Sequence, residues 1–176
     1  MSAGRRLFFA LWPDEPEREA VVERFQTSGL RDALGGRPVP VHNLHLTLVF
    51  LGTVPDECFD RLHAAAGQFP RPGRFSLRLD RFGIFAPARV AWLGAEPVPA
   101  AVRLVDALRG VAGTAGVPID ERPWCPHVTL LRRIEGRAAP RLPPPPTPLD
   151  WPVRAFALVE SIPGRPYQVL RTWPVE

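Results

Sequence analysis

Short apolar runs and regularly spaced apolar residues alternate along the chain and predict a mixed helix and strand protein. Apolar runs or strict alternation predict strands at residues 7–12, 44–51, 75–80, 89–94, 126–132, 153–161 and 167–173. Apolar positions at helical spacing predict helices over 15–26, from Asp56 to about Phe69, and over 98–112. The last two strands are expected to form a hairpin across Pro163 and Gly164.

Local signals predict where several of these elements begin and end. Asp14 followed by Glu17 is typical of a capping box at the start of the first helix. Gly52 is expected to end the second strand, and Asp56 to cap the second helix. Residues 35–40 and the tract Pro143–Pro146 are expected to form loops. The tract is interpreted as a polyproline connector, with a docking site for a partner as the alternative.

An internal repeat is the most informative feature of the sequence. The interval from Leu11 to His45 equals the interval from Leu93 to His127, and each contains a strand, a turn, an amphipathic helix and a strand that opens at the histidine. Two copies of one unit are expected to pack about a pseudo-twofold axis with equivalent strands face to face. This packing would bring the two histidines together.

The same four-residue pattern, His-x-Thr-Leu, opens both of these strands. His45 and Thr47, and likewise His127 and Thr129, are two positions apart and therefore share one face of a strand. Because imidazole changes charge near neutral pH, one ring can act as a base while the other acts as an acid. The threonine hydroxyls are suited to holding phosphate oxygens. Together the four side chains predict a site for in-line attack at phosphorus.

Composition narrows the class of protein further. The chain has 176 residues, 45% hydrophobic and 23% charged, which favours one globular domain over residues 1–176 rather than a disordered or fibrous protein. All 22 basic residues are arginine and the formal net charge is +4, which suits a small phosphate-bearing ligand better than a DNA duplex. Cys58 and Cys125 are too few for a disulfide framework and have no metal-binding spacing. We expect a cytoplasmic protein with no signal peptide, membrane span, metal or cofactor.

Longer matches around the motifs resemble a known family. They are Arg6-Leu-Phe-Phe-Ala10, His45-Leu-Thr-Leu-Val-Phe-Leu-Gly52, Arg89-Val-Ala-Trp92-Leu-Gly94, Pro126-His-Val-Thr-Leu-Leu-Arg132 and Tyr167-Gln-Val-Leu-Arg-Thr-Trp173. Together they resemble the bacterial RNA 2′,3′-cyclic phosphodiesterase family, also labelled 2′-5′ RNA ligase, of the two-histidine phosphoesterase superfamily. The resemblance covers nearly the whole chain.

The resemblance implies a bilobal α+β fold with two antiparallel sheets lining a central cleft. It implies metal-free hydrolysis of the 2′,3′-cyclic phosphate at an RNA 3′ end to a 2′-phosphate, reversible as ligation to a 5′ hydroxyl. His45 and His127 would be the catalytic pair, with His127 the base for water and His45 the acid toward the 3′ oxygen. Thr47 and Thr129 would bind the phosphate. The partner would be RNA, and we expect the protein to act as a monomer.

The resemblance further implies that Arg132 contacts phosphate and that Phe50 stacks on a base. Strand parity argues against both, because an offset of five residues from each histidine points to the opposite face. Arg133 has the correct parity and is the alternative to Arg132.

Several alternatives remain open at this point. The same chemistry could act on 2′-5′ linked oligonucleotides or cyclic nucleotide-sugar phosphates, and a non-catalytic RNA-binding module is a further possibility. Cys125, two residues before His127, could form a Cys–His nucleophile, although the other repeat has Asn43 in its place. His42 and His63 have no partner in the repeat and are expected in a loop and on a helix surface.

Overall fold

The structure is a computed structural model, and it describes residues 4–135 and 141–176. Its elements follow the chain in this order: β1 (Gly4–Leu11), α1 (Glu15–Thr27), α2 (Leu30–Leu34), β2 (Arg37–Pro38), the 3-10 helix η1 (Val41–Asn43), β3 (Leu46–Pro55), α3 (Asp56–Ala66), β4 (Phe75–Phe85), β5 (Val90–Ala95), α4 (Pro99–Thr114), β6 (His127–Arg132), β7 (Leu149–Val153), β8 (Ala155–Glu160) and β9 (Gln168–Pro174). The predicted α+β class is confirmed.

The strands form one antiparallel sheet with a clear internal symmetry. Its order is β7-β4-β5-β6-β3-β1-β8-β9, and β2 pairs with β6 off this path. From the pair of central strands outward, the strand order β6-β5-β4-β7 in one half corresponds to β3-β1-β8-β9 in the other half. The two predicted sheets are therefore halves of one sheet. They meet where β3 and β6 pair through Leu46 and Val128.

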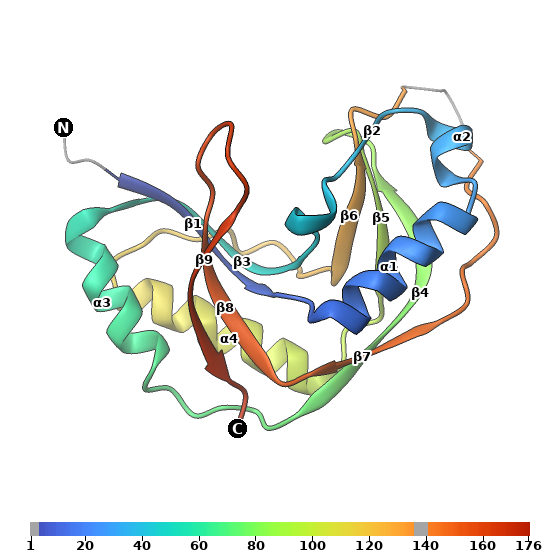
Figure 1. Cartoon of the computed structure of the whole chain (residues 1–176). Coiled ribbons are helices and arrows are strands. Elements are labelled where there is room, and N and C mark those ends of the chain that lie inside the picture. Colours follow the sequence, from blue (N-terminus) through green and yellow to red (C-terminus); the bar gives the residue numbers. More distant parts are fainter. Residues whose placement is uncertain (1–3, 136–140) are drawn as a thin grey trace.

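The helices cover one side of this sheet and form the core with it. Helix α4 contacts β3 and α3, whereas α1 contacts β7. Figure 1 shows α3 and α4 beneath the half that contains β1, β3, β8 and β9, with α1 and α2 beside the other half. One apolar cluster includes buried residues of both halves, among them Phe9, Leu46, Leu93, Leu104 and Val128. A smaller cluster of Phe8, Ala10, Ala157 and Val159 is separate from it.

The structure corrects several predicted boundaries. Asp14 is the N-cap of α1, but its side chain makes no capping hydrogen bond, so the capping box is not formed. Asp56 is the first residue of α3, and Pro55 is its N-cap. Strand β3 continues past Gly52, whose φ of +68° lies in the left-handed region that glycine adopts without a Cβ penalty.

Two strands were not expected from the sequence. The predicted strand at 153–161 is replaced by β7, at one end of the sheet order, and β8, next to the other end, with Arg154 between them in the chain. Strand β2 lies within the predicted loop at 35–40, because Arg37 and Pro38 pair with β6. The predicted hairpin is confirmed by the antiparallel pairing of β8 and β9.

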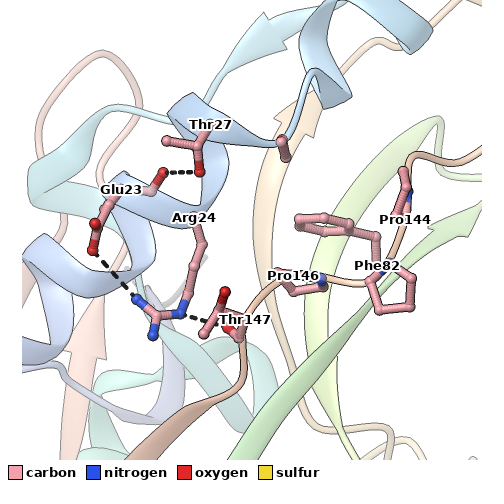
Figure 2. Close-up of a pocket in the computed structure, with 9 residues that line it drawn as sticks. Glu23, Arg24, Thr27, Phe82, Pro144, Pro146 and Thr147 are labelled. Carbon is pink, nitrogen blue, oxygen red and sulfur yellow. Dashed lines mark hydrogen bonds and ion pairs between the residues drawn. The ribbon is translucent and has the colours of Figure 1, made fainter.

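The proline tract runs along the outer side of α1. Arg24 donates hydrogen bonds from Nε to the carbonyl oxygen of Thr147 at 2.9 Å and from Nη2 to that of Pro148 at 3.0 Å. Figure 2 shows this guanidinium between Glu23 and Thr147, beside a cavity of about 380 Å³ that the prolines and Phe82 help to line. The tract therefore lies beside α1 and leads into β7.

Candidate active site

The two histidines lie on either side of the junction between β3 and β6. Leu46 and Val128 are opposite each other in this antiparallel pair. The flanking residues therefore face across the junction, His45 toward Thr129 and Thr47 toward His127. Leu46 and Val128 point into the core, so the four flanking side chains share the other side of the sheet. The equivalent strands thus lie side by side in one sheet, not face to face as predicted, and they still bring the two motifs together.

Each histidine ring is oriented by the same backbone contact. Nδ1 of His45 is 2.7 Å from the carbonyl oxygen of Asn43, and Nδ1 of His127 is 2.7 Å from that of Cys125. Because a carbonyl can only accept, Nδ1 carries the hydrogen, and in the neutral ring Nε2 has the free lone pair. Nε2 of His45 lies 3.1 Å from Oγ1 of Thr47, which can donate to it. Both Nε2 atoms are therefore the basic nitrogens of their rings.

The electrostatic surroundings keep both rings neutral in the free protein. Burial is the main cause that lowers the pKa of His45 to about 4, and the positive charge of Arg132 and the neighbouring His127 lower it further. The pKa of His127 is lowered by burial and then by Arg132. The negative charge of an anion bound here would raise both pKa values, so anion binding and protonation of the rings would favour each other.

A bulge in β6 places Arg132 on the side of the sheet where the histidines lie, which explains its effect on their pKa values. In the pairing of β5 with β6, Ala91 is opposite Leu131 and Trp92 is opposite Thr129, so Leu130 is an extra residue. Leu130 and Leu131 are both buried, and Arg132 returns to the side of Thr129. The parity argument against Arg132 is therefore wrong for this strand.

Strand β3 has the equivalent bulge at Leu48. In its pairing with β1, Phe9 is opposite Val49 and Ala10 is opposite Thr47. Phe50 therefore lies on the side of His45 and Thr47, and it is 46% exposed, with the guanidinium of Arg6 5.0 Å from its ring centre. The alternative residue Arg133 follows the end of β6, has a φ of +55°, and is not among the charges that shift either histidine.

Aromatic side chains enclose each histidine, and the sequence did not single them out as site residues. Trp12 stacks on His45 with ring centres 5.8 Å apart and an interplanar angle of 13°, while Phe8 and Tyr167 lie 4.8 Å and 5.3 Å away. The backbone N–H of Tyr167 donates to Oδ1 of Asn43 at 2.9 Å, which attaches the β8–β9 loop to the residue that orients His45. Phe8 and Tyr167 lie within the segments that match the family, and this match is the feature of the sequence that could have identified them as site residues.

His127 has a different aromatic environment, made by Phe85 and Trp92. Their ring centres lie 4.9 Å and 6.0 Å from the imidazole. The indole of Trp92 lies over two glycines of the sheet, since a Cβ on Gly83 would be 2.1 Å from it and a Cβ on Gly94 would be 2.6 Å from it. Its buried Nε1 has no hydrogen-bond acceptor within the described part of the chain. Both rings are half-buried and contact the histidine.

The side chains of the remaining candidates take no part in this arrangement. Cys125 contributes its carbonyl oxygen to His127, and burial raises the pKa of its thiol, which opposes a thiolate nucleophile. His42 is exposed in η1. His63 is half-buried in α3 and contacts Phe59 and Trp173. Within residues 4–135 and 141–176, no three histidine, cysteine or acidic side chains come together as metal ligands. The same residues contain no helix long and apolar enough to span a membrane.

Sequence and structure comparisons agree on the class of protein that has this fold and site. Residues 12–165 match the 2′-5′ RNA ligase superfamily, and the chain belongs to this superfamily. It is 38% identical to the RNA 2′,3′-cyclic phosphodiesterase of Escherichia coli, over 98% of both chains. It is 40% identical to the protein of the same name from Thermus thermophilus, over 89% of this chain and 81% of the relative. The crystal structure of E. coli LigT complexed with 3′-AMP superimposes with a TM-score of 0.83 at 36% identity, covering 97% of this chain and 98% of that one.

Proposed function

We propose that the protein hydrolyses the 2′,3′-cyclic phosphate at RNA 3′ ends to a 2′-phosphate through His45 and His127. The observation that carries this proposal is the pairing of two His-Thr motifs across the β3–β6 junction, with both Nδ1 atoms anchored to backbone carbonyls. The names of the relatives from E. coli and T. thermophilus support the substrate. Two basic nitrogens on either side of one phosphorus atom are what an in-line displacement requires.

In the proposed reaction, Nε2 of His127 takes a proton from water while the water oxygen attacks phosphorus. The bond from phosphorus to O3′ breaks, and Nε2–H of His45 donates its proton to O3′, so the product is a 2′-phosphate with a free 3′ hydroxyl. Exchange with solvent then returns both rings to their starting states. A 5′ hydroxyl in the place of water would give a 2′-5′ linkage by the same steps, with His127 taking the proton of that hydroxyl and O3′ again leaving with the proton of His45.

Substrate binding favours the uptake from solvent of the proton that His45 needs as the acid. The pKa of about 4 in the free protein leaves this ring neutral near pH 7. The negative phosphate stabilises the imidazolium directly and also offsets the charge of Arg132 that lowers the pKa. Thr47, Thr129 and Arg132 hold the non-bridging oxygens in this proposal. Phe50 stacks on the base.

Cleavage of an RNA oligonucleotide that ends in a 2′,3′-cyclic phosphate tests the proposal. We expect EDTA-resistant, bell-shaped activity with pH, a 2′-phosphate product, and a loss of about 10²-fold or more in His45→Ala and in His127→Ala. His42→Ala removes an exposed imidazole from η1 and is the matched control. A folded wild-type protein that leaves the terminus intact, or that releases a 3′-phosphate, would refute the proposed reaction.

We also propose that the chain forms one functional unit and that it is located in the cytoplasm. Residues 1–176 act as a single domain and as a monomer, a proposal supported by the apolar cluster that includes both halves of the sheet. Both cysteines are free thiols, which is usual for proteins of the cytoplasm. Size-exclusion chromatography with light scattering checks the monomer.

A further inference from the structure

A second arginine lies beside Arg132 on the strand that the sequence did not predict. Arg37 of β2 is directly opposite Arg132 of β6, and directly opposed residues of an antiparallel pair point to the same side of a sheet. The next pair, Pro38 and Leu131, points the other way, with Leu131 fully buried and Pro38 beside α1 residues in an apolar cavity. Arg37 therefore shares the side of the sheet on which the histidines lie.

The backbone before Arg37 is built for this close approach. Gly36 has a φ of +88°, and a Cβ at this position would lie 2.8 Å from the carbonyl oxygen of Arg132. Any other residue would strain the backbone and push β2 away from β6. β2 pairs with β6 beyond the point where β3 and β6 meet, as Figure 1 shows. Along β6, His127 and Thr129 flank the paired residue Val128, and Arg132 lies farther on, with Arg37 beside it.

Two like charges directly opposite each other destabilise a strand pair unless something neutralises them. Both side chains are exposed, and within the described residues neither guanidinium has a carboxylate partner. Some exposed arginines of this chain are paired, for example Arg78 with Asp150, whereas others such as Arg165 have no ion pair within the described residues. Arg37 and Arg132 therefore present two guanidiniums without a carboxylate partner on one surface, and a guanidinium has the geometry for bidentate binding of phosphate.

The two arginines differ in their distance from the reacting centre. The charge of Arg132 lowers the pKa of both histidines, whereas Arg37 contributes to neither shift. Arg132 is thus close enough to share the phosphate with the histidines, and Arg37 is farther along the same surface.

We propose that Arg37 binds the phosphodiester that precedes the terminal cyclic phosphate, so that the site selects an RNA end over a cyclic mononucleotide. This inference rests on the proposed function, because it takes the cyclic phosphate to lie between the histidines. Arg37 does not touch the reacting phosphorus. It acts on substrate choice through the neighbouring nucleotide.

The test compares two substrates, adenosine 2′,3′-cyclic phosphate and the dinucleotide ApA with a 2′,3′-cyclic phosphate end. We expect Arg37→Ala to lower kcat/KM for the dinucleotide by about tenfold or more, the usual effect of losing a hydrogen bond to a charged group, and to leave the mononucleotide within twofold. Arg132→Ala should lower both. Arg37→Lys should recover part of the dinucleotide activity, because it restores the charge without the bidentate geometry. Arg103→Ala, an exposed arginine on α4, is the matched control.

The outcomes separate this inference from the proposed function. Equal losses on both substrates, or no loss on either, overturn the role of Arg37 while the proposed function stands. If the wild type hydrolyses neither substrate, the proposed function fails. Binding of a single-stranded oligonucleotide, followed by fluorescence anisotropy against salt, then still tests Arg37. Its replacement should reduce the slope of log K against log salt by about 0.7, and an unchanged slope refutes the contact.

Discussion

Because His45 is buried as a neutral ring, the free energy of unfolding should depend on pH. Replacing His45 with a side chain that does not titrate should remove this contribution. The unfolded chain has an ordinary imidazole with a pKa near 6.5, whereas the folded protein lowers the pKa of His45 to about 4. Between these values the unfolded state binds the proton more readily. The stability contributed by the neutral ring is therefore complete above pH 6.5 and is lost as the pH falls toward 4.

The size of the effect follows from the two pKa values. One pKa unit corresponds to about 1.4 kcal/mol, so a difference between 6.5 and about 4 corresponds to on the order of 3 kcal/mol. His45→Gln keeps a polar side chain that does not titrate. We expect the difference in unfolding free energy between wild type and His45→Gln to shrink by about this amount from pH 7.5 to pH 4.

Urea unfolding followed by tryptophan fluorescence, at half-unit steps of pH, measures this difference directly. His42→Gln, which alters an exposed imidazole on η1, should give a curve parallel to that of the wild type. If the curves of His45→Gln and wild type are also parallel over this range, His45 is not held neutral by burial. The same linkage predicts that a 2′-nucleotide binds the wild type more tightly as the pH falls from 7.5 toward 5, because the bound anion favours the protonated rings.

Three further predictions test other parts of the structure. Gly83→Ala should displace the indole of Trp92, lowering stability by about 1–3 kcal/mol in thermal unfolding and reducing kcat through the contact with His127; unchanged values would refute the close packing. Arg24→Met should keep the aliphatic packing on α1 but lose the hydrogen bonds to the carbonyl oxygens of Thr147 and Pro148. We expect the free energy of unfolding in urea to fall by about 1–3 kcal/mol and the segment that contains the prolines to become sensitive to limited proteolysis. Arg24→Lys should recover little of this stability, because lysine cannot reproduce the two hydrogen bonds. A 3′-deoxynucleoside 2′-(4-nitrophenyl phosphate) has a leaving group that needs no acid, so His45→Ala should retain most of its turnover while His127→Ala should not; the opposite result would exchange the two roles.

Local patterns predicted much of the fold because they depend on residues close in sequence. The apolar spacing of α3 and α4, the alternation in β4 and the hairpin of β8 and β9 all appear near their predicted positions. The failures have a common physical cause. Strand β2 is two residues long and exists only because β6 offers it a partner. Strand β7 lies in the opposite half of the sheet from its neighbour in sequence, β8. No local pattern records such pairing.

The site shows the same division between sequence and tertiary structure. By itself, the sequence determined the duplicated unit, the two His-x-Thr-Leu motifs and the resemblance that led to a phosphoester reaction, because each is a matter of residue type and spacing. Only the tertiary structure decided which sides of the strands the later residues occupy. The bulges at Leu48 and Leu130 reverse strand parity after each threonine and bring Phe50 and Arg132 to the histidine side.

A bulge is a mismatch between two strands, so it is defined by the partner as much as by the strand that contains it. The same holds for the lowered pKa of His45, which results from burial among distant segments, and for the position of Arg37 beside Arg132. The types of side chain in the site can therefore be read from the sequence. Their geometry is set by pairing between residues far apart in the chain.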